Sequence, residues 1–203
     1  MAVIAVALNA AALPIAVAGR GSAVLRRFLA LQAGGARNLL VFADQPSQDL
    51  RRAAGPALRE HLPDRAKLAG LRVLWIVELP DDITQRLVSQ AQAERVLVNV
   101  EDQPALCEFH NVAEVRRGDL LLTVSTGGAS PRLAARIRAW LDARFEPEWA
   151  VRLDLLRVRR AGWRRSGEDA ATLTDALLET KGWLQDDPYL RAGNRLAGWR
   201  GAR

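Results

Sequence analysis

The amino-acid sequence predicts an α/β protein in which an open, doubly wound parallel sheet is followed by a mostly helical part. Short apolar runs alternate with amphipathic helical stretches as far as residue 111. This alternation is typical of strand–helix–strand crossovers. From Pro131 onward, apolar residues recur at helical spacing only, which predicts a change of architecture between the two parts.

Each expected element has its own apolar pattern and its own boundaries. Apolar runs bounded by glycine or polar residues predict strands at 13–18, 37–44, 70–79, 95–100 and 119–125. Amphipathic stretches predict helices at 23–35, at 81–94, from 131 onward and at 166–184. The expected N-terminal caps are Ser130, followed by Pro131, and Ser166, followed by Asp169.

Helical spacing also predicts which side chains face the core. The inward positions of these helices, in chain order, are Val24, Leu25, Phe28, Leu29, Leu31, Ile83, Leu87, Val88, Leu133, Ile137, Trp140, Leu141, Leu173, Leu177 and Leu178.

The charge balance narrows the classes of partner. The 203 residues carry a formal net charge of +6, so the surface attracts polyanions. Arginines are scattered over helical faces and aromatic residues make up 5%, which argues against a nucleic-acid binder. The apolar N-terminus has no basic leader and is interrupted by Asn9 and Pro14, so we expect a strand with its lead-in and no membrane segment. The single cysteine, Cys107, fits a reducing cytoplasm.

The segment GRGSAV follows the first expected strand and opens a helix. In that context Gly19 would make the tight turn, and Gly21 would let a pyrophosphate approach the backbone at the helix N-terminus. Val24 stands where a small residue is usual and is expected to hold helix and strand slightly apart. Asp44, at the end of the second strand, can accept from a ribose 2′-hydroxyl, which favours NAD over NADP. The alternative is an ordinary strand-to-helix turn.

Three segments together resemble a known family. They are the loop AGRGSAVLRR (18–27), the segment VNVEDQPALCEF (98–109) and the segment RRGDLLLTVSTGGASPRLAARIRAWLD (116–142). They resemble precorrin-2 dehydrogenase/sirohydrochlorin ferrochelatase, the siroheme synthase module that makes siroheme from precorrin-2. The similarity runs from Leu13 to Phe145.

The resemblance implies a Rossmann-like NAD-binding domain at 1–111, a dimerisation region at 112–148 and a small helical C-terminal domain at 149–203. It also implies a homodimer whose subunits together shape a cleft for a tetrapyrrole. The residues that it implies for the cofactor are Gly19, Arg20, Gly21, Ser22, Ala23, Ala43 and Asp44.

The resemblance gives the acid–base role to Asp102. Precorrin-2 loses a hydride to NAD⁺ and a proton elsewhere to become sirohydrochlorin, and Fe²⁺ insertion then displaces the pyrrolic protons, so one carboxylate in the cleft could accept these protons in turn. Glu101 is the neighbouring rival, which on an extended chain would point to the opposite side. The alternative for Asp102 is a capping role before Pro104.

Polar groups and arginines are the candidates for holding the substrate carboxylates. Tentative contacts are Asn99, Ser125, Thr126 and Gly127, with Arg116, Arg117, Arg132 and Arg136 as the basic candidates. The hydroxyl-glycine turn is alternatively only a strand-to-helix turn. His61 and His110 have no partner at helical spacing, so no resident metal site is expected and Fe²⁺ enters as a substrate.

Several positions depart from the family pattern, among them Val112, near which the family usually has a proline. Arg20 stands between the glycines, and the strand end that usually reads Ala-Ala-Thr-Asp-Asp is here the segment 78–82, ELPDD. Three functions therefore stay open: the bifunctional enzyme, a dehydrogenase without chelatase activity, and a non-catalytic NAD-binding module. In the basic tail, Trp163, Trp183 and Trp199 are expected to pack within the helical domain, the alternative being an amphipathic surface for a membrane or nucleic acid.

Overall fold

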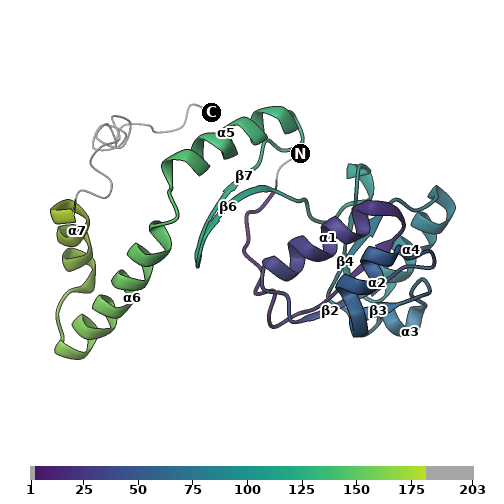
Figure 1. The fold of residues 1–203 in the computed structure, drawn as a ribbon, viewed down its shortest axis with the longest axis horizontal. Helices are drawn as coiled ribbons and strands as arrows, with labels where there is room; N and C mark the ends of the chain where they lie inside the picture. Colours follow the sequence, from purple (N-terminus) through teal and green to yellow (C-terminus); the bar gives the residue numbers. More distant parts are fainter. Residues whose placement is uncertain (1–2, 182–203) are drawn as a thin grey trace. The chain divides into compact units, whose positions relative to one another are not determined.

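The computed structural model describes residues 3–181 and divides them into two compact units (Figure 1). Residues up to Asn111 form the first unit, and residues from Val112 onward form the second. The predicted fold class is confirmed: the first unit carries a parallel sheet with helices, and the second is mostly helical.

The sheet of the first unit contains five strands, all parallel, in the order β3-β2-β1-β4-β5. In chain order they are β1 (Pro14–Gly19), β2 (Asn38–Phe42), β3 (Leu58–Arg59), β4 (Val73–Val77) and β5 (Leu97–Val100). The strand order reverses between β1 and β4. In doubly wound sheets, ligands bind beyond the carboxyl ends of the strands at such a switch point.

The helices of the first unit connect successive strands. They are α1 (Gly21–Ala33), α2 (Gln48–Ala54), α3 (Arg65–Leu68) and α4 (Asp81–Ala93), with short 3₁₀ turns η1 (Gly55–Ala57) and η2 (Pro104–Leu106). The elements between residues 45 and 69 were not predicted, because each is short and lies in a polar, proline-containing passage.

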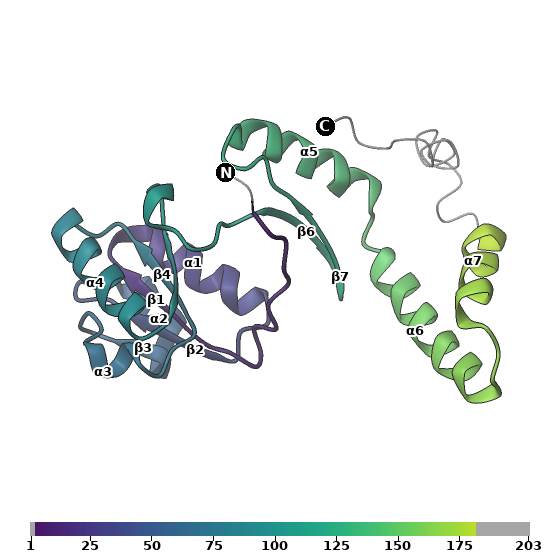
Figure 2. The ribbon, with the colours of Figure 1, turned by 180° about the vertical axis from the view of Figure 1, so that it is seen from behind.

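Alternate strand residues pack on opposite faces of the sheet, so the unit has two apolar clusters. On one face, Val17 and Val41 pack with Phe28 of α1 and Leu50 of α2. On the other, strand residues such as Ile76 pack with α3 and α4. This two-sided burial explains why the strands read as continuous apolar runs, and Figure 2 shows the helices around the sheet from behind.

One predicted core position in α1 is wrong. Leu29 is 46% exposed, whereas Val24 and Phe28 are buried. The buried stripe of α1 is therefore narrower than the helical pattern indicated, and Leu29 lies beyond its edge. In α4 the pattern holds, with Leu87 and Val88 buried and Ile83 partly buried against the core.

The second unit begins with a hairpin that the sequence only half predicted. Strands β6 (Ala113–Arg117) and β7 (Leu120–Val124) pair antiparallel as a separate two-stranded sheet. The β6 sequence AEVRR is mostly polar, and of its residues only Val115 is buried. As far as residue 181, three helices follow: α5 (Pro131–Arg144), α6 (Trp149–Ser166) and α7 (Ala170–Lys181).

The cap predicted at Ser166 is wrong. Ser166 ends α6, where its hydroxyl donates to the carbonyl oxygen of Trp163 at 3.0 Å. Asp169 caps α7 instead, since its carboxylate accepts from the backbone N–H of Ala171 at 3.0 Å. Gly167, in the left-handed conformation with φ of 78°, separates the two helices.

Part of the predicted tail lies outside the described residues. Trp183, Trp199 and the end of the helix expected at 166–184 belong to that part. Trp163 is half-buried. Within residues 3–181, no helix has the length and apolar character needed to cross a bilayer.

A test of the sheet follows from Gly19. A Cβ atom there would lie 2.1 Å from the backbone carbonyl oxygen of Val77 on β4, so Gly19→Ala forces two paired strands apart. We expect a loss of about 2 kcal/mol in the free energy of unfolding, measured by urea denaturation followed by circular dichroism.

Gly70→Ala is the matched control. Its added methyl group would meet only the Lys67 carbonyl oxygen at 3.8 Å, and a change within about 0.5 kcal/mol is expected. Equal stabilities of the two variants would contradict the close strand contact at Gly19.

Candidate cofactor and acid–base site

The turn from β1 into α1 requires both of its glycines. The backbone N–H of Arg20 donates to the carbonyl oxygen of Val77 at 3.1 Å, and Gly19 leaves room for this approach. Gly21 has φ of +69°, in the left-handed region that favours glycine. The fully buried Val24 side chain comes within 3.0 Å of the position that a Gly19 Cβ would take, so Val24 fills space that the glycine leaves.

Helix α1 itself places no acidic or capping side chain at its N-terminus. The N-cap residue Arg20 makes no side-chain capping bond, and the first turn contains no acidic residue. The first N–H groups of the helix are thus free to face a ligand. Ser22 is exposed, and its hydroxyl accepts from Arg26 at 3.0 Å, whereas Ala23 is buried in the core.

Arg20 binds the carboxylate of Asp44, the residue that the sequence predicts to contact the adenosine ribose. Its Nε lies 2.8 Å from Asp44 Oδ1 and its Nη2 lies 2.5 Å from Asp44 Oδ2. These hydrogen bonds lower the pKa of Asp44 below its ordinary value. Asp44 therefore stays ionised, but the positive charge of Arg20 lies beside it. This charge weakens the repulsion between Asp44 and a 2′-phosphate, and with it the expected preference for NAD over NADP.

Ala43 is placed by the sheet. Its side chain is 1% exposed and packs in the core, and its backbone N–H donates to the carbonyl oxygen of Arg59 on β3 at 3.0 Å. Ala43 thus orients Asp44, the next residue, at the strand end.

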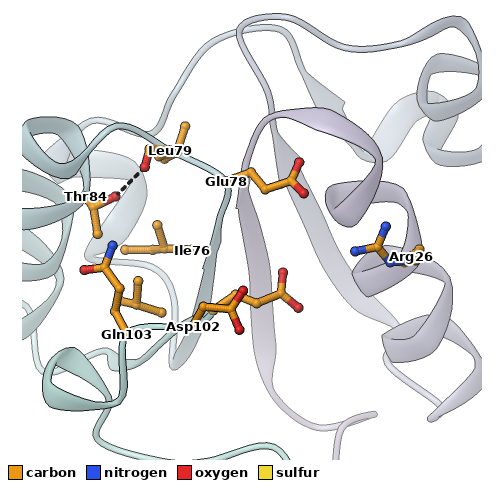
Figure 3. Close-up of a pocket in the computed structure, with 9 residues that line it drawn as sticks. Arg26, Ile76, Glu78, Leu79, Thr84, Asp102 and Gln103 are labelled. Carbon is orange, nitrogen blue, oxygen red and sulfur yellow. Dashed lines mark hydrogen bonds between the residues drawn. The ribbon is translucent and has the colours of Figure 1, made fainter.

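A cavity of about 190 Å³ lies at the carboxyl ends of β4 and β5. Ligand pockets usually enclose roughly 300–1,000 Å³, so this cavity has room for only part of a ligand. Its lining residues are Arg26, Ile76, Glu78, Leu79, Thr84, Val100, Glu101, Asp102 and Gln103. Arg26 belongs to the helix that the glycine turn opens, so one cavity joins that helix to Asp102 (Figure 3).

Glu101 and Asp102 differ in their partners. The expectation that Glu101 points away from the cavity is wrong, because the chain turns at these residues and both line the cavity. Glu101 is held by Arg27 of α1, with Oε1 3.1 Å from Nη2. Asp102 is exposed, has φ of 60°, and its carboxylate has no partner among the residues that the structure describes. Of these two neighbours, Asp102 is therefore the one whose carboxylate is not held by an ion pair.

Glu78 also turns its side chain with a left-handed backbone, at φ of 49°. Its carboxylate projects from the end of β4 toward α1 (Figure 3), and Glu78 lines the same cavity as Asp102. A Cβ atom on Gly21 would lie 1.8 Å from Glu78 Oε2. The sequence shows that this strand end departs from the family pattern, but no local signal in it indicates where the Glu78 side chain lies.

The loop fits the adenosine half of a dinucleotide, with one exception. The bare N–H groups of α1 suit a pyrophosphate and Asp44 suits a ribose hydroxyl. The exception is Glu78, which brings a negative charge to the place where the phosphates would lie. Pro80, in the same unusual segment, is the N-cap of α4, and its carbonyl oxygen accepts from the backbone N–H of Thr84.

Asn99, a tentative substrate contact, is 4% exposed. Its Nδ2 donates to the carbonyl oxygen of Phe109 at 2.8 Å, and its Oδ1 accepts from Asn111 at 3.1 Å. This side chain ties β5 to the segment after η2, a placement that argues against a substrate contact.

The turn between β7 and α5 explains the hydroxyl-glycine segment locally. Ser125 accepts from the N–H of Gly127 at 3.2 Å, and Thr126 accepts from the N–H of Ser130 at 3.2 Å. Ser130 caps α5 by accepting from Leu133, as predicted. Gly127 and the next glycine have φ of 59° and 84°, so glycine is required there. Ser125 and Gly127 remain exposed.

Of the four candidate arginines, Arg117 is partly buried and the other three are exposed. Arg117 is structural, because its guanidinium binds Asp142 and the Phe145 carbonyl oxygen and so ties the hairpin to α5. Arg116 pairs with Glu114 at 3.4 Å, whereas Arg132 and Arg136 are exposed on α5. Over the described part of the chain, no group of His, Cys, Asp and Glu side chains is arranged to hold a metal ion.

Two family models match the chain. The family described as putative NAD(P)-binding covers residues 6–113, and the family described as sirohaem biosynthesis protein central covers residues 117–143. The first therefore contains the glycine turn, Glu78 and Asp102, and the second contains the turn before α5.

Relatives of this chain carry the name siroheme synthase. That of Ectopseudomonas mendocina is 35% identical over 138 residues, covering 65% of this chain and 29% of the relative. That of Methylococcus capsulatus is 30% identical over 177 residues, covering 78% of this chain and 37% of the relative. The chain thus spans little more than a third, or less, of the length of these curated relatives.

Among solved structures, the chain is similar to SirC, a precorrin-2 dehydrogenase. The TM-score is 0.73 at 20% identity, with 93% of this chain and 95% of that chain covered. This similarity confirms the fold. Since the putative NAD(P)-binding model also spans more than half of the chain and the matched relatives are siroheme synthases, the chain belongs to the putative NAD(P)-binding family found in siroheme synthases.

Proposed function

We propose that this protein oxidises precorrin-2 to sirohydrochlorin with NAD⁺ and then inserts Fe²⁺ to give siroheme. The observation that carries the proposal is the single cavity shared by the end of β5, where Asp102 has no partner, and by the helix that the glycine turn opens. The names of the siroheme synthase relatives and of the SirC structure support the choice of substrate.

Bound NAD⁺ would supply the acceptor for the hydride that precorrin-2 loses. The chain itself would supply position and proton transfer. The free N–H groups of α1 would hold the pyrophosphate and Asp44 the adenosine ribose, which directs the nicotinamide half toward the strand ends. The unpaired Asp102 carboxylate would take the proton that leaves the macrocycle.

The same carboxylate would serve the second step. When Fe²⁺ enters sirohydrochlorin, the pyrrolic nitrogens release their protons, so the site must again supply a proton acceptor. Glu101 is less suited to this role because Arg27 holds its carboxylate. Exposed basic residues, such as Arg132 and Arg136, are proposed to attract the substrate carboxylates.

An absorbance assay with the purified full chain tests the function. Conversion of precorrin-2 only when NAD⁺ is present, followed by a second spectral change on adding Fe²⁺ or Co²⁺, is the expected result. A change with NAD⁺ and none with metal would leave a dehydrogenase. No change under any condition would favour the non-catalytic module. The Glu78 carboxylate beside Gly21 is the observation that favours this second candidate.

Replacing Asp102 should affect chemistry and not cofactor binding. Asp102→Ala removes the free carboxylate, and we expect precorrin-2 oxidation to slow by about a thousandfold, with the NADH dissociation constant unchanged. Stopped-flow absorbance and NADH fluorescence measure the two quantities. Glu101→Gln tests the neighbouring carboxylate and should keep most of the oxidation rate. If Glu101→Gln slowed oxidation more than Asp102→Ala, the acid–base role would belong to Glu101.

Cofactor preference should depend on the Arg20–Asp44 pair. Arg20→Ala removes the positive charge beside Asp44, so we expect the ratio of the NADPH to the NADH dissociation constant to rise about tenfold. Asp44→Asn should lower this ratio. Arg65→Ala, which breaks an ion pair with Glu94 elsewhere in the unit, should leave it unchanged. An unchanged ratio in all three variants would exclude the pair from cofactor selection.

We also propose that 112–148 forms the dimer contact and that 149–203 forms a small helical domain. Leu133, Ile137 and Trp140 recur at helical spacing on α5, and they are 50%, 36% and 49% exposed. These three apolar side chains, which were predicted to face the core, are therefore exposed to solvent. A second copy of the chain would cover them.

A charge on this apolar face should separate the subunits. Ile137→Asp is expected to convert the dimer into a monomer at micromolar concentration, measured by sedimentation velocity, because it buries an unpaired carboxylate in the contact. Ala135→Asp introduces the same residue on the opposite side of α5 and should leave the dimer intact. Two dimeric variants, or a monomeric unmodified chain, would contradict this interface.

A further inference from the structure

The carboxylate of Glu78 occupies the space directly over Gly21. A Cβ on Gly21 would lie 1.8 Å from Glu78 Oε2 and 3.1 Å from its Cδ, so Glu78 supplies the nearest side-chain atoms to that position. The acidic side chain of Glu78, which follows the neighbouring strand β4, thus covers the glycine turn at the start of α1.

The covered space is the one a dinucleotide needs. The second glycine of such a turn lets the pyrophosphate come close to the backbone, where the helix N-terminus attracts negative charge. Helix α1 has no acidic residue in its first turn and no capping side chain. The negative group at this position is therefore supplied by Glu78, from another element.

Glu78 is held there by no specific partner. It is exposed, and it makes no hydrogen bond or ion pair with any residue in the described ranges. Its left-handed backbone, at φ of 49°, directs the side chain as it leaves β4. The carboxylate can rotate away, but an ionised group near the bound phosphates would still repel them.

We propose that Glu78 competes with the cofactor's pyrophosphate for the N-terminus of α1 and thereby sets the affinity of the site. The side chain covers Gly21 in the free protein and turns away when the dinucleotide enters. This inference rests on the proposed use of a nicotinamide dinucleotide, and it adds a residue that lowers the affinity of that site.

Binding to the full chain tests the proposal without any catalytic step. Titrations with NADH, followed by fluorescence, and with ADP and adenosine, followed by calorimetry, are made on the unmodified chain, Glu78→Gln and Glu78→Ala. Both variants should bind NADH and ADP about tenfold more tightly, because a negative charge beside the phosphates is removed. Adenosine lacks phosphates, and its affinity should not change.

Asp81→Asn is the matched control. Asp81 is three residues from Glu78 at the start of α4, but its carboxylate accepts from Gln103 at 3.1 Å. Its NADH dissociation constant should stay within about twofold of the unmodified value. Equal NADH affinities for the unmodified chain and both Glu78 variants would overturn this inference alone. Tighter adenosine binding in the variants would also overturn it, because the effect would then not act on the phosphates. If none of these proteins binds NADH, the proposed function fails as well.

Discussion

The site depends on the close contact of β1 with β4 at Gly19. Gly19 and Val77 are register partners, and the N–H of Arg20 donates to the Val77 carbonyl oxygen at 3.1 Å. No side chain fits between the strands there. Since β5 pairs parallel with β4, the glycine turn, Glu78 and Asp102 all leave the sheet at one edge.

Two ion pairs form at this edge of the sheet, and Glu78 and Asp102 take part in neither of them. Arg20 binds Asp44, and Arg27 binds Glu101. Glu78 and Asp102 are unpaired within residues 3–181, and both have left-handed backbones. One of the unpaired acids lies over the turn that would hold phosphates, and the other lines the cavity where the macrocycle would lose protons. In the proposed function, one carboxylate would oppose binding of the phosphates and the other would accept a proton.

Patterns that act through the backbone were predictable from the sequence. Continuous apolar runs located the longer strands, and two glycines after the first of them located the turn. Side-chain directions were not predictable, because they depend on left-handed residues and on partners far apart in the chain. Nothing local in the sequence indicates that Arg20 would reach Asp44, that Glu78 would cover Gly21, or that the chain would turn both Glu101 and Asp102 into one cavity. The strand β6 was missed for a related reason: its polar sequence carries one buried side chain.

The structure of the chain bound to NAD⁺ and sirohydrochlorin tests the account most directly. In that structure we expect the pyrophosphate against the backbone of Gly21 with Glu78 turned away, and the Asp102 carboxylate within hydrogen-bonding distance of the macrocycle. A dinucleotide bound away from this turn, or a macrocycle that does not reach Asp102, would contradict it.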